Sequence, residues 1–226
     1  SICEDKLRQS DIILSIDGHD IADDGTVEFR PGERTHFSHF SDIRQIRDPL
    51  LLSILRQGKE MEVRLSTDST GAESLLVPSE KYGVRPRYFI FGGMVISQLT
   101  KNVLMRWGRG WENTAPREMV NELSEWPSPS KREVVVILQV LPADVNIGYH
   151  SIGSRVLKTV DGASCVGLKE AYRMILDGDG QHCVLGLNQE AKLVIDREQA
   201  LSSHEDVLSQ YSISADCSDD LRELRK

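Results

Sequence analysis

Histidine, aspartate and serine are the residue types in this chain that could together perform nucleophilic catalysis. Such catalysis requires a serine oriented by a His-Asp pair beside backbone N–H groups that stabilise an oxyanion. The chain has six histidines, which fall in expected turns, polar helices or hairpin edges: His19, His36, His39, His150, His182 and His204. No serine stands in the glycine-rich setting of a nucleophile elbow. The sequence therefore predicts no catalytic residue.

Two short groups of side chains have types that could bind a metal ion. His36 and His39 are three residues apart, but zinc usually takes four ligands and no cysteine or aspartate cluster is near them in sequence. Asp20, Asp23 and Asp24 lack the glycine and the closing glutamate of an EF-hand calcium loop. We interpret the histidines as a solvated helix face and the aspartates as turn formers, and we predict neither a metal site nor a cofactor.

The elements that must position any functional group follow a pattern that occurs twice. An apolar strand runs into an Asp-Gly turn at 13–18 and again at 156–162. Each turn is followed by a helix-like stretch and then by a pair of apolar runs typical of a hairpin, at 50–65 and 183–195. Because these few elements bury little apolar surface alone, the recurrence indicates one small module that is used twice.

The bulk composition narrows the classes of function. A net charge of −8 over 226 residues argues against a nucleic-acid surface, because phosphate binding depends on clustered lysine and arginine. The longest apolar runs, at 134–141 and 90–96, are too short to span a membrane. Residues 1–9 contain no targeting segment, and the lack of an initial methionine fits a fragment boundary.

Four cysteines are spread along the chain without a C-x-x-C pair: Cys3, Cys165, Cys183 and Cys217. Their number is too small for a disulfide scaffold, so we expect free thiols in a reducing, intracellular compartment. The sequence does not distinguish between chloroplast, mitochondrion and nucleus.

The order of elements predicts a mixed α+β fold with a first module at 1–70, a linker at 71–87, a second module at 88–211 and a polar, frayed tail at 212–226. In the first module, residues 23–36 read as a loop. A helical spacing of apolar residues then runs from Phe37 to Ile46 and ends before Pro49.

In the second module, residues 89–96 read as one buried strand that contains Gly92 and Gly93. Helix candidates at 99–107 and 117–126, with all three tryptophans in this part of the chain, predict a helical insertion at about 98–130. An amphipathic helix is expected at 166–176, closed by Gly178.

Several motifs resemble the PDZ domains of the Deg/HtrA serine proteases. Residues 7–18, Leu-Arg-Gln-Ser-Asp-Ile-Ile-Leu-Ser-Ile-Asp-Gly, are similar to the family's element of a Gly-Asp pair, a strand and an Asp-Gly or Asn-Gly turn, with Ser10 at the usual glycine position. Residues 22–30 with 33–34 resemble an insertion of the plant-type, eukaryotic members. Residues 88–96 resemble the opening strand of their second PDZ domain, and 138–141 with 145–149 the segment after its insertion.

The resemblance covers residue 7 to about residue 215. It implies two PDZ-like units, each a partly open β-barrel or sandwich with flanking helices, and it makes the first unit incomplete, since its carboxylate loop should lie ahead of Leu7. It further implies the C-terminal PDZ region of an ATP-independent serine endopeptidase whose protease domain is absent from this chain. The alternative is a stand-alone, non-catalytic peptide-binding scaffold protein.

PDZ domains bind a C-terminal peptide by strand addition and hold its carboxylate on backbone N–H groups of a glycine-containing loop. Matched to this chain, the resemblance places the loop at 91–94, the accepting strand at 94–97 and the facing helix at 167–176. The candidate peptide-binding residues are Phe91, Gly92, Gly93, Met94, Val95, Ile96, Lys169, Tyr172 and Arg173.

Gly92 departs from the family pattern, which has a bulky apolar residue there. We expect Gly93→Val to weaken peptide binding without unfolding the module. The partners that the resemblance implies are peptides or unfolded-protein segments, and further copies of the parent protease in a homo-oligomer. A ligand groove and a structural or assembly surface remain open as alternatives.

Overall fold

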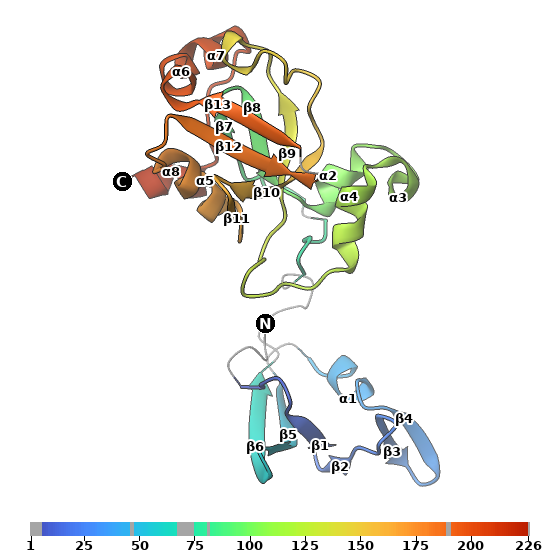
Figure 1. The fold of residues 1–226 in the computed structure, drawn as a ribbon. Coiled ribbons are helices and arrows are strands. Elements are labelled where there is room, and N and C mark those ends of the chain that lie inside the picture. The colour runs from blue at the N-terminus through green and yellow to red at the C-terminus, as the bar shows by residue number, and fades with distance from the viewer. Residues whose placement is uncertain (1–5, 46–47, 67–74, 81, 189–190, 226) are drawn as a thin grey trace. The chain divides into compact units, whose positions relative to one another are not determined.

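The computed structural model describes residues 6–45, 48–66, 75–80, 82–188 and 191–225. The chain forms two compact units, Ser1–Ser74 and Leu75–Lys226. Figure 1 shows the strands and helices of each unit. The architecture is the predicted mixed α+β class, with helices flanking open sheets.

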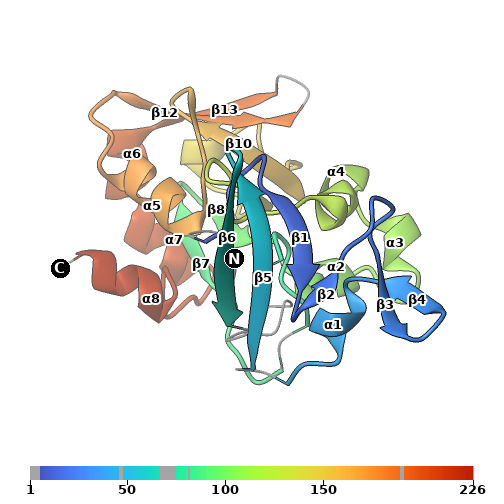
Figure 2. The same cartoon turned by 90° about the horizontal axis from the view of Figure 1, so that it is seen from below.

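The first unit is built on a four-stranded antiparallel sheet with the strand order β2-β1-β5-β6, whose strands lie side by side in Figure 2. The strands are β1 (Ile12–Ile16), β2 (His19–Asp20), β5 (Pro49–Arg56) and β6 (Lys59–Ser66). A separate hairpin, β3 (Thr26–Arg30) with β4 (Glu33–His36), and one helical turn, α1 (His39–Asp42), complete it. The predicted hairpin at 50–65 is confirmed.

Two local predictions for the first unit need correction. Residues 23–36 are not wholly a loop, because Val27 is fully buried and the Pro31-Gly32 pair turns the chain between β3 and β4. The helix is shorter than predicted, since α1 ends at Asp42 and Ile43 is exposed. Ile46 lies outside the described residues.

The second unit is built on a larger sheet in which the order β13-β12-β10-β9-β8-β7 runs from edge to edge and β11 pairs with β10. Its strands are β7 (Tyr88–Phe91), β8 (Met94–Gln98), β9 (Val135–Val140), β10 (Arg155–Val160), β11 (Ala163–Ser164), β12 (His182–Leu187) and β13 (Lys192–Asp196). The predicted hairpin at 183–195 is thus confirmed as β12 and β13.

Helices cover both faces of this sheet. Successive residues of β9 point to opposite sides, so this strand contributes to a core on each face. Val135 and Ile137 pack in the core that includes α5 (Leu168–Leu176). Val134 and Val136 pack in a second core with Leu104 and the insertion helices. The insertion comprises α2 (Lys101–Met105), α3 (Trp111–Thr114), α4 (Arg117–Val120) and the 3-10 helix Asn121–Ser124, which Figure 1 shows grouped away from α5.

The remaining helices follow β13 or connect the strands of the second unit. They are the 3-10 helix Asp144–Asn146, α6 (Arg197–Ser202), α7 (His204–Gln210), α8 (Asp219–Arg222) and the 3-10 helix Glu223–Arg225. Among the described residues, no helix is long and apolar enough to cross a membrane.

The structure differs from the sequence-based boundaries at both ends of the second unit. Leu76 and Val77, expected in a linker, are buried in the core of the insertion helices. The expectation of a frayed tail at 212–226 is wrong, because Cys217 and Leu221 are almost fully buried in the main core. Two apolar side chains in a polar segment are enough to anchor it when a sheet edge lies beside it.

The two units repeat the same hydrogen-bond register, which confirms the predicted duplication. β1 pairs with β5 with a bulge after Ile13, and β10 pairs with β12 with a bulge after Leu157. The aspartate of each Asp-Gly turn donates its backbone N–H to the neighbouring strand, Asp17 to Leu51 O and Asp161 to Val184 O, both at 2.8 Å.

The side chains of the two turn aspartates also play equivalent roles. Asp17 Oδ1 accepts the N–H of Leu51 at 3.1 Å, and Asp161 Oδ1 accepts the N–H of Val184 at 2.7 Å. The other oxygen of each pairs with an arginine, Arg44 for Asp17 and Arg197 for Asp161. The arginines come from unrelated positions in the two units, so the aspartate is the conserved feature of the repeat.

Candidate functional site

The strand expected to accept a peptide, β8, already has a partner on each side. It forms a hairpin with β7, in which Phe91 lies opposite Met94 and Phe89 lies opposite Ile96. On its other side, Val95 lies opposite Gln139 of β9. A strand has only two hydrogen-bonding edges, so β8 has no free edge to which a further strand could be added.

Residues 89–96 are therefore not one strand, as the sequence suggested, but a tight hairpin. Gly92 and Gly93 form its two-residue turn, with φ angles of +52° and +78°. Such a turn requires positive φ at both positions, which glycine adopts without steric cost. β7 consequently folds back along β8, in the antiparallel direction that a C-terminal ligand of a PDZ domain would take.

The turn is enclosed rather than open to a ligand carboxylate. A Cβ atom at Gly93 would lie 2.6 Å from the carbonyl oxygen of Leu141, so the expected tolerance of Gly93→Val is wrong. Asn146, which is fully buried, donates from Nδ2 to Gly92 O and to Leu141 O, both at 2.8 Å. Its Oδ1 accepts the N–H of Ala143 at 3.0 Å. Asn146 thus fastens the turn to the loop after β9.

The space between β8 and α5 is filled by side chains of β7. The ring of Phe89 meets the ring of Tyr172 on α5 edge to face, with centroids 5.0 Å apart. Phe89, Phe91 and Tyr172 are all buried. The aromatic contact occupies the position where the resemblance implied a peptide side chain.

The other two expected helix residues do not join Tyr172. Lys169 and Arg173 are exposed on α5, on the solvent side of the helix. Lys169 lines a cavity of about 670 Å³ together with Arg87, Arg132 and Asp220. The structure therefore brings together seven of the nine candidate residues. Residues 91–96 lie in the closed hairpin, and Tyr172 packs against it. Lys169 and Arg173 remain at the surface.

The outer edge of β7 is covered in turn by the C-terminal segment. Cys217 bridges to Phe89 in antiparallel pairing, Ile90 donates its N–H to Asp216 O at 2.8 Å, and Ser218 donates its N–H to Tyr88 O at 2.9 Å. This pairing has little signature in the sequence, since the segment is polar. The Gly-Gly pair, in contrast, is a recognised hairpin signal that could have identified β7.

Within the described residues, the start of β1 in the first unit lacks the neighbouring strand that β10 has in the second unit. In the second unit, β9 pairs with Arg155, Val156 and Leu157 at the start of β10. By register, the equivalent residues in the first unit are 11–13, and among the described residues β1 pairs on that side only with β2, at Ser15 and Ile16. Ile12 is accordingly 58% exposed, whereas its equivalent Val156 is 1% exposed.

Other groups of reactive side chains are structural. Cys165, Cys183 and Cys217 are buried free thiols, and burial raises the pKa of Cys165 to about 11 and that of Cys183 to about 12. Cys3 lies outside the described residues. His36 and His39 pack against Phe37 and Phe29, and no three metal-binding side chains gather among the described residues.

Comparison with known proteins agrees with this architecture. The family model of the PDZ domain matches residues 77–220. The mitochondrial Do-like 3 protein of Arabidopsis thaliana is 31% identical over 216 residues, which are 96% of this chain and 36% of that protein. The chloroplastic protease Do-like 2 of the same plant is 26% identical over 218 residues, covering 96% and 35%. A serine protease DegP homolog of Plasmodium falciparum is 30% identical over 172 residues, covering 75% and 18%.

The chain thus spans about a third of the length of the plant relatives that it matches. The family match includes the hairpin of β7 and β8, the helical insertion, α5 and the segment that covers β7. Since it extends over more than half of the residues, the chain belongs to the PDZ domain family and is homologous to the corresponding region of Do-like proteases.

Proposed function

We propose that this chain is the PDZ region of a Do-like, ATP-independent serine endopeptidase, in which the second unit serves assembly and positioning rather than the capture of free C-terminal peptides. The observation that carries the proposal is the pairing of β8 with β7 and β9. A groove already occupied by its own chain offers a fixed surface to other subunits. It supports homo-oligomer assembly over recognition of peptides or unfolded segments at this strand.

Because β8 has no free edge, we assign the strand addition expected at β8 to the start of β1 in the first unit instead. We also propose the domain layout: a first module at 1–70, a linker, a second module and an insertion at about 98–130. The incompleteness of the first module is part of the proposal, and the exposed Ile12 and the unfilled position beside 11–13 support it. A strand there would be apolar and antiparallel to β1, as β9 is to β10.

The test is calorimetric titration of the chain with a pool of peptides that have free apolar C-termini. We expect no saturable heat, because no β8 edge is free, and a self-association constant by sedimentation that is unchanged by the peptides. Saturable binding that shifts the NMR amide resonances of Met94 and Ile96 in β8 would reject the proposal and restore a ligand groove at the second unit.

The location of the relatives bears on the compartment. The plant proteins named above are mitochondrial and chloroplastic. We extend an organellar location to this chain as part of the proposal, to be tested by fractionation of cells that express the tagged full-length protein. Recovery in the cytosolic fraction alone would contradict it.

A further inference from the structure

The segment 213–222, here named the strap, covers the outer edge of β7: residues 216–218 pair with the strand as a bound peptide would, and the helix α8 (Asp219–Arg222) follows. The paired part runs antiparallel to β7, with the hydrogen bonds from Ile90 N–H and to Tyr88 O described above. Tyr88 adds two more contacts, donating its backbone N–H to Ser218 Oγ at 3.2 Å and its hydroxyl to Ala215 O at 2.8 Å. The strap therefore satisfies a sheet edge mainly through backbone groups, which any extended strand can supply.

Charge complementarity adds to the backbone pairing. The strap carries the acidic residues Asp216, Asp219 and Asp220, and two of them meet basic groups outside the strap. Asp216 lies 3.2 Å from His204 of α7, and Asp220 accepts from Arg87 Nε at 2.7 Å. Desolvation raises the pKa of Asp220, but hydrogen bonds from Ser218 and Arg87 outweigh it and leave that pKa below its usual value. The covered surface is thus suited to an acidic strand.

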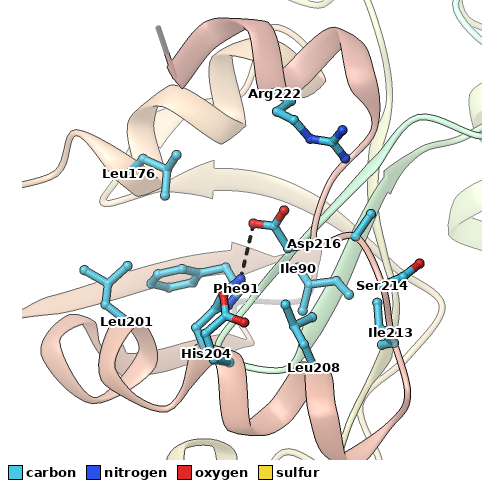
Figure 3. Close-up of a pocket in the computed structure, with 12 residues that line it drawn as sticks. Ile90, Phe91, Leu176, Leu201, His204, Leu208, Ile213, Ser214, Asp216 and Arg222 are labelled. Carbon is cyan, nitrogen blue, oxygen red and sulfur yellow. Dashed lines mark hydrogen bonds and ion pairs between the residues drawn. The ribbon is translucent and has the colours of Figure 1, made fainter.

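A cavity of about 570 Å³ opens where the strap leaves the edge of β7. Figure 3 shows Ile90, Leu201 and Leu208 around it, with the pair of His204 and Asp216 at its rim. Leu201 is exposed, so the cavity has an apolar opening. An apolar side chain of a ligand could enter here without displacing α6 or α7.

We propose that the outer edge of β7 is a binding site for an acidic peptide with a short extended part that pairs with β7 and a helical turn after it, and that the strap occupies the site as a displaceable internal competitor. The partner has a small apolar residue beside one aspartate and a second acidic residue four positions further on, as Asp216, Cys217 and Asp220 do. The site lies one strand outside β8. This site does not depend on the proposed function, because the site is tested at β7 and the proposed function is tested at β8.

The bonds that hold the strap at its rim are exposed enough to be altered without disturbing the core. The side chains of Asp216 and Asp220 are 14% and 33% exposed, whereas Cys217 and Leu221 are almost fully buried. Asp216→Asn with Asp220→Asn therefore weakens the strap and keeps its apolar anchors. Asp219→Asn is the matched control, because the Asp219 side chain is 81% exposed and pairs with Arg222 inside the strap.

The experiment uses a fluorescein-labelled synthetic peptide with the sequence of residues 212–222 and the complete chain. We expect the double variant to bind the peptide at least tenfold more tightly than the unaltered chain, and Asp219→Asn to bind within twofold of it. A peptide with its three aspartates changed to asparagine should bind at least fivefold more weakly, and added salt should reduce the difference. Equal affinities of all three proteins, or of both peptides, would overturn the proposal.

A second measurement tests the same site without the double variant, so its result does not depend on whether that variant folds. In the unaltered chain, excess peptide should accelerate hydrogen exchange of the Ser218 amide and leave the amides of β9 unchanged. If Ser218 stays equally protected at saturating peptide, the strap is a fixed part of the fold and the proposal fails. Faster exchange at Ser218 with β8 unchanged would support this site, whereas changes confined to β8 would contradict both this site and the proposed function.

Discussion

The two units of this chain use the same strand, Asp-Gly turn and hairpin, yet they treat their sheet edges in opposite ways. The second unit adds β9, β8 and β7 in succession and then covers β7 with the strap. The first unit leaves the start of β1 without such a neighbour among the described residues. The neighbours of each edge, and not the core that the two units share, therefore set which edge a further strand could join.

The largest effect is expected at the closed turn of the second unit. Gly93→Ala should reduce the free energy of unfolding by about 4 kcal/mol, since it adds both backbone strain and a close approach to Leu141 O. Gly162→Ala has a similar φ, +84°, but no atom within 4 Å of the added carbon, and should cost about 1 kcal/mol. Urea unfolding followed by tryptophan fluorescence reports on this unit. Equal losses would mean that the turn is not enclosed.

The second largest loss of stability is expected when Asn146 is replaced. Asn146→Ala removes the donors to Gly92 O and Leu141 O and leaves buried carbonyls without partners, so we expect a loss of about 3 kcal/mol. The described residues of the first unit contain no equivalent turn, so its own unfolding, followed by NMR of its isoleucine methyl groups, should not change. A loss below about 1 kcal/mol would show that the turn is held by β7 itself.

The equivalent strand positions give a direct comparison of the two edges. Val156→Ala should cost about 2 kcal/mol, because Val156 is buried beneath the insertion helices. Ile12→Ala should cost less than about 0.5 kcal/mol, because Ile12 is exposed. If a longer form of the protein supplies a strand beside 11–13, the cost of Ile12→Ala in that form should rise toward the value for Val156. An unchanged cost there would argue against an incomplete first module.

The smallest effect concerns acid stability of the first unit. A hydrogen bond from Arg56, stronger than the opposing desolvation, lowers the pKa of Asp11 to about 2 from 3.8. Because the folded pKa is the lower one, this stabilisation is present above pH 4 and is lost as the pH falls toward 2. Asp11→Asn should flatten the pH dependence of the first unit between pH 4 and 2, measured by NMR. The second unit, which has Arg155 at the equivalent position, should not respond.

The sequence predicted those parts of the fold that depend on neighbouring residues. The Asp-Gly turns and the hairpins at 50–65 and 183–195 are short-range features, and each was located correctly. Asp17 and Asp161 then repeat their hydrogen bonds because the same local geometry is built twice. The class of fold and the helical insertion followed from apolar spacing and from the cluster of tryptophans.

The closed edge was missed because it depends on contacts between distant residues. Phe89 lies against Tyr172, and Cys217 pairs with Phe89 from 128 positions further along the chain. Neither contact has a signature in apolar periodicity, since the strap has only two buried anchors in a polar stretch. Asn146 was missed for a related reason, as a single buried amide cannot be told from a surface one by sequence.

Hydrogen exchange at β8 tests most directly whether the second unit is closed by its own strand. In a two-residue hairpin, the amides of Met94 and Ile96 point toward β7, and the amide of Val95 points toward β9. We predict that all three amides exchange slowly and at similar rates in the peptide-free chain. Fast exchange of Met94 and Ile96 with continued protection of Val95 would show a free β8 edge and would contradict this prediction.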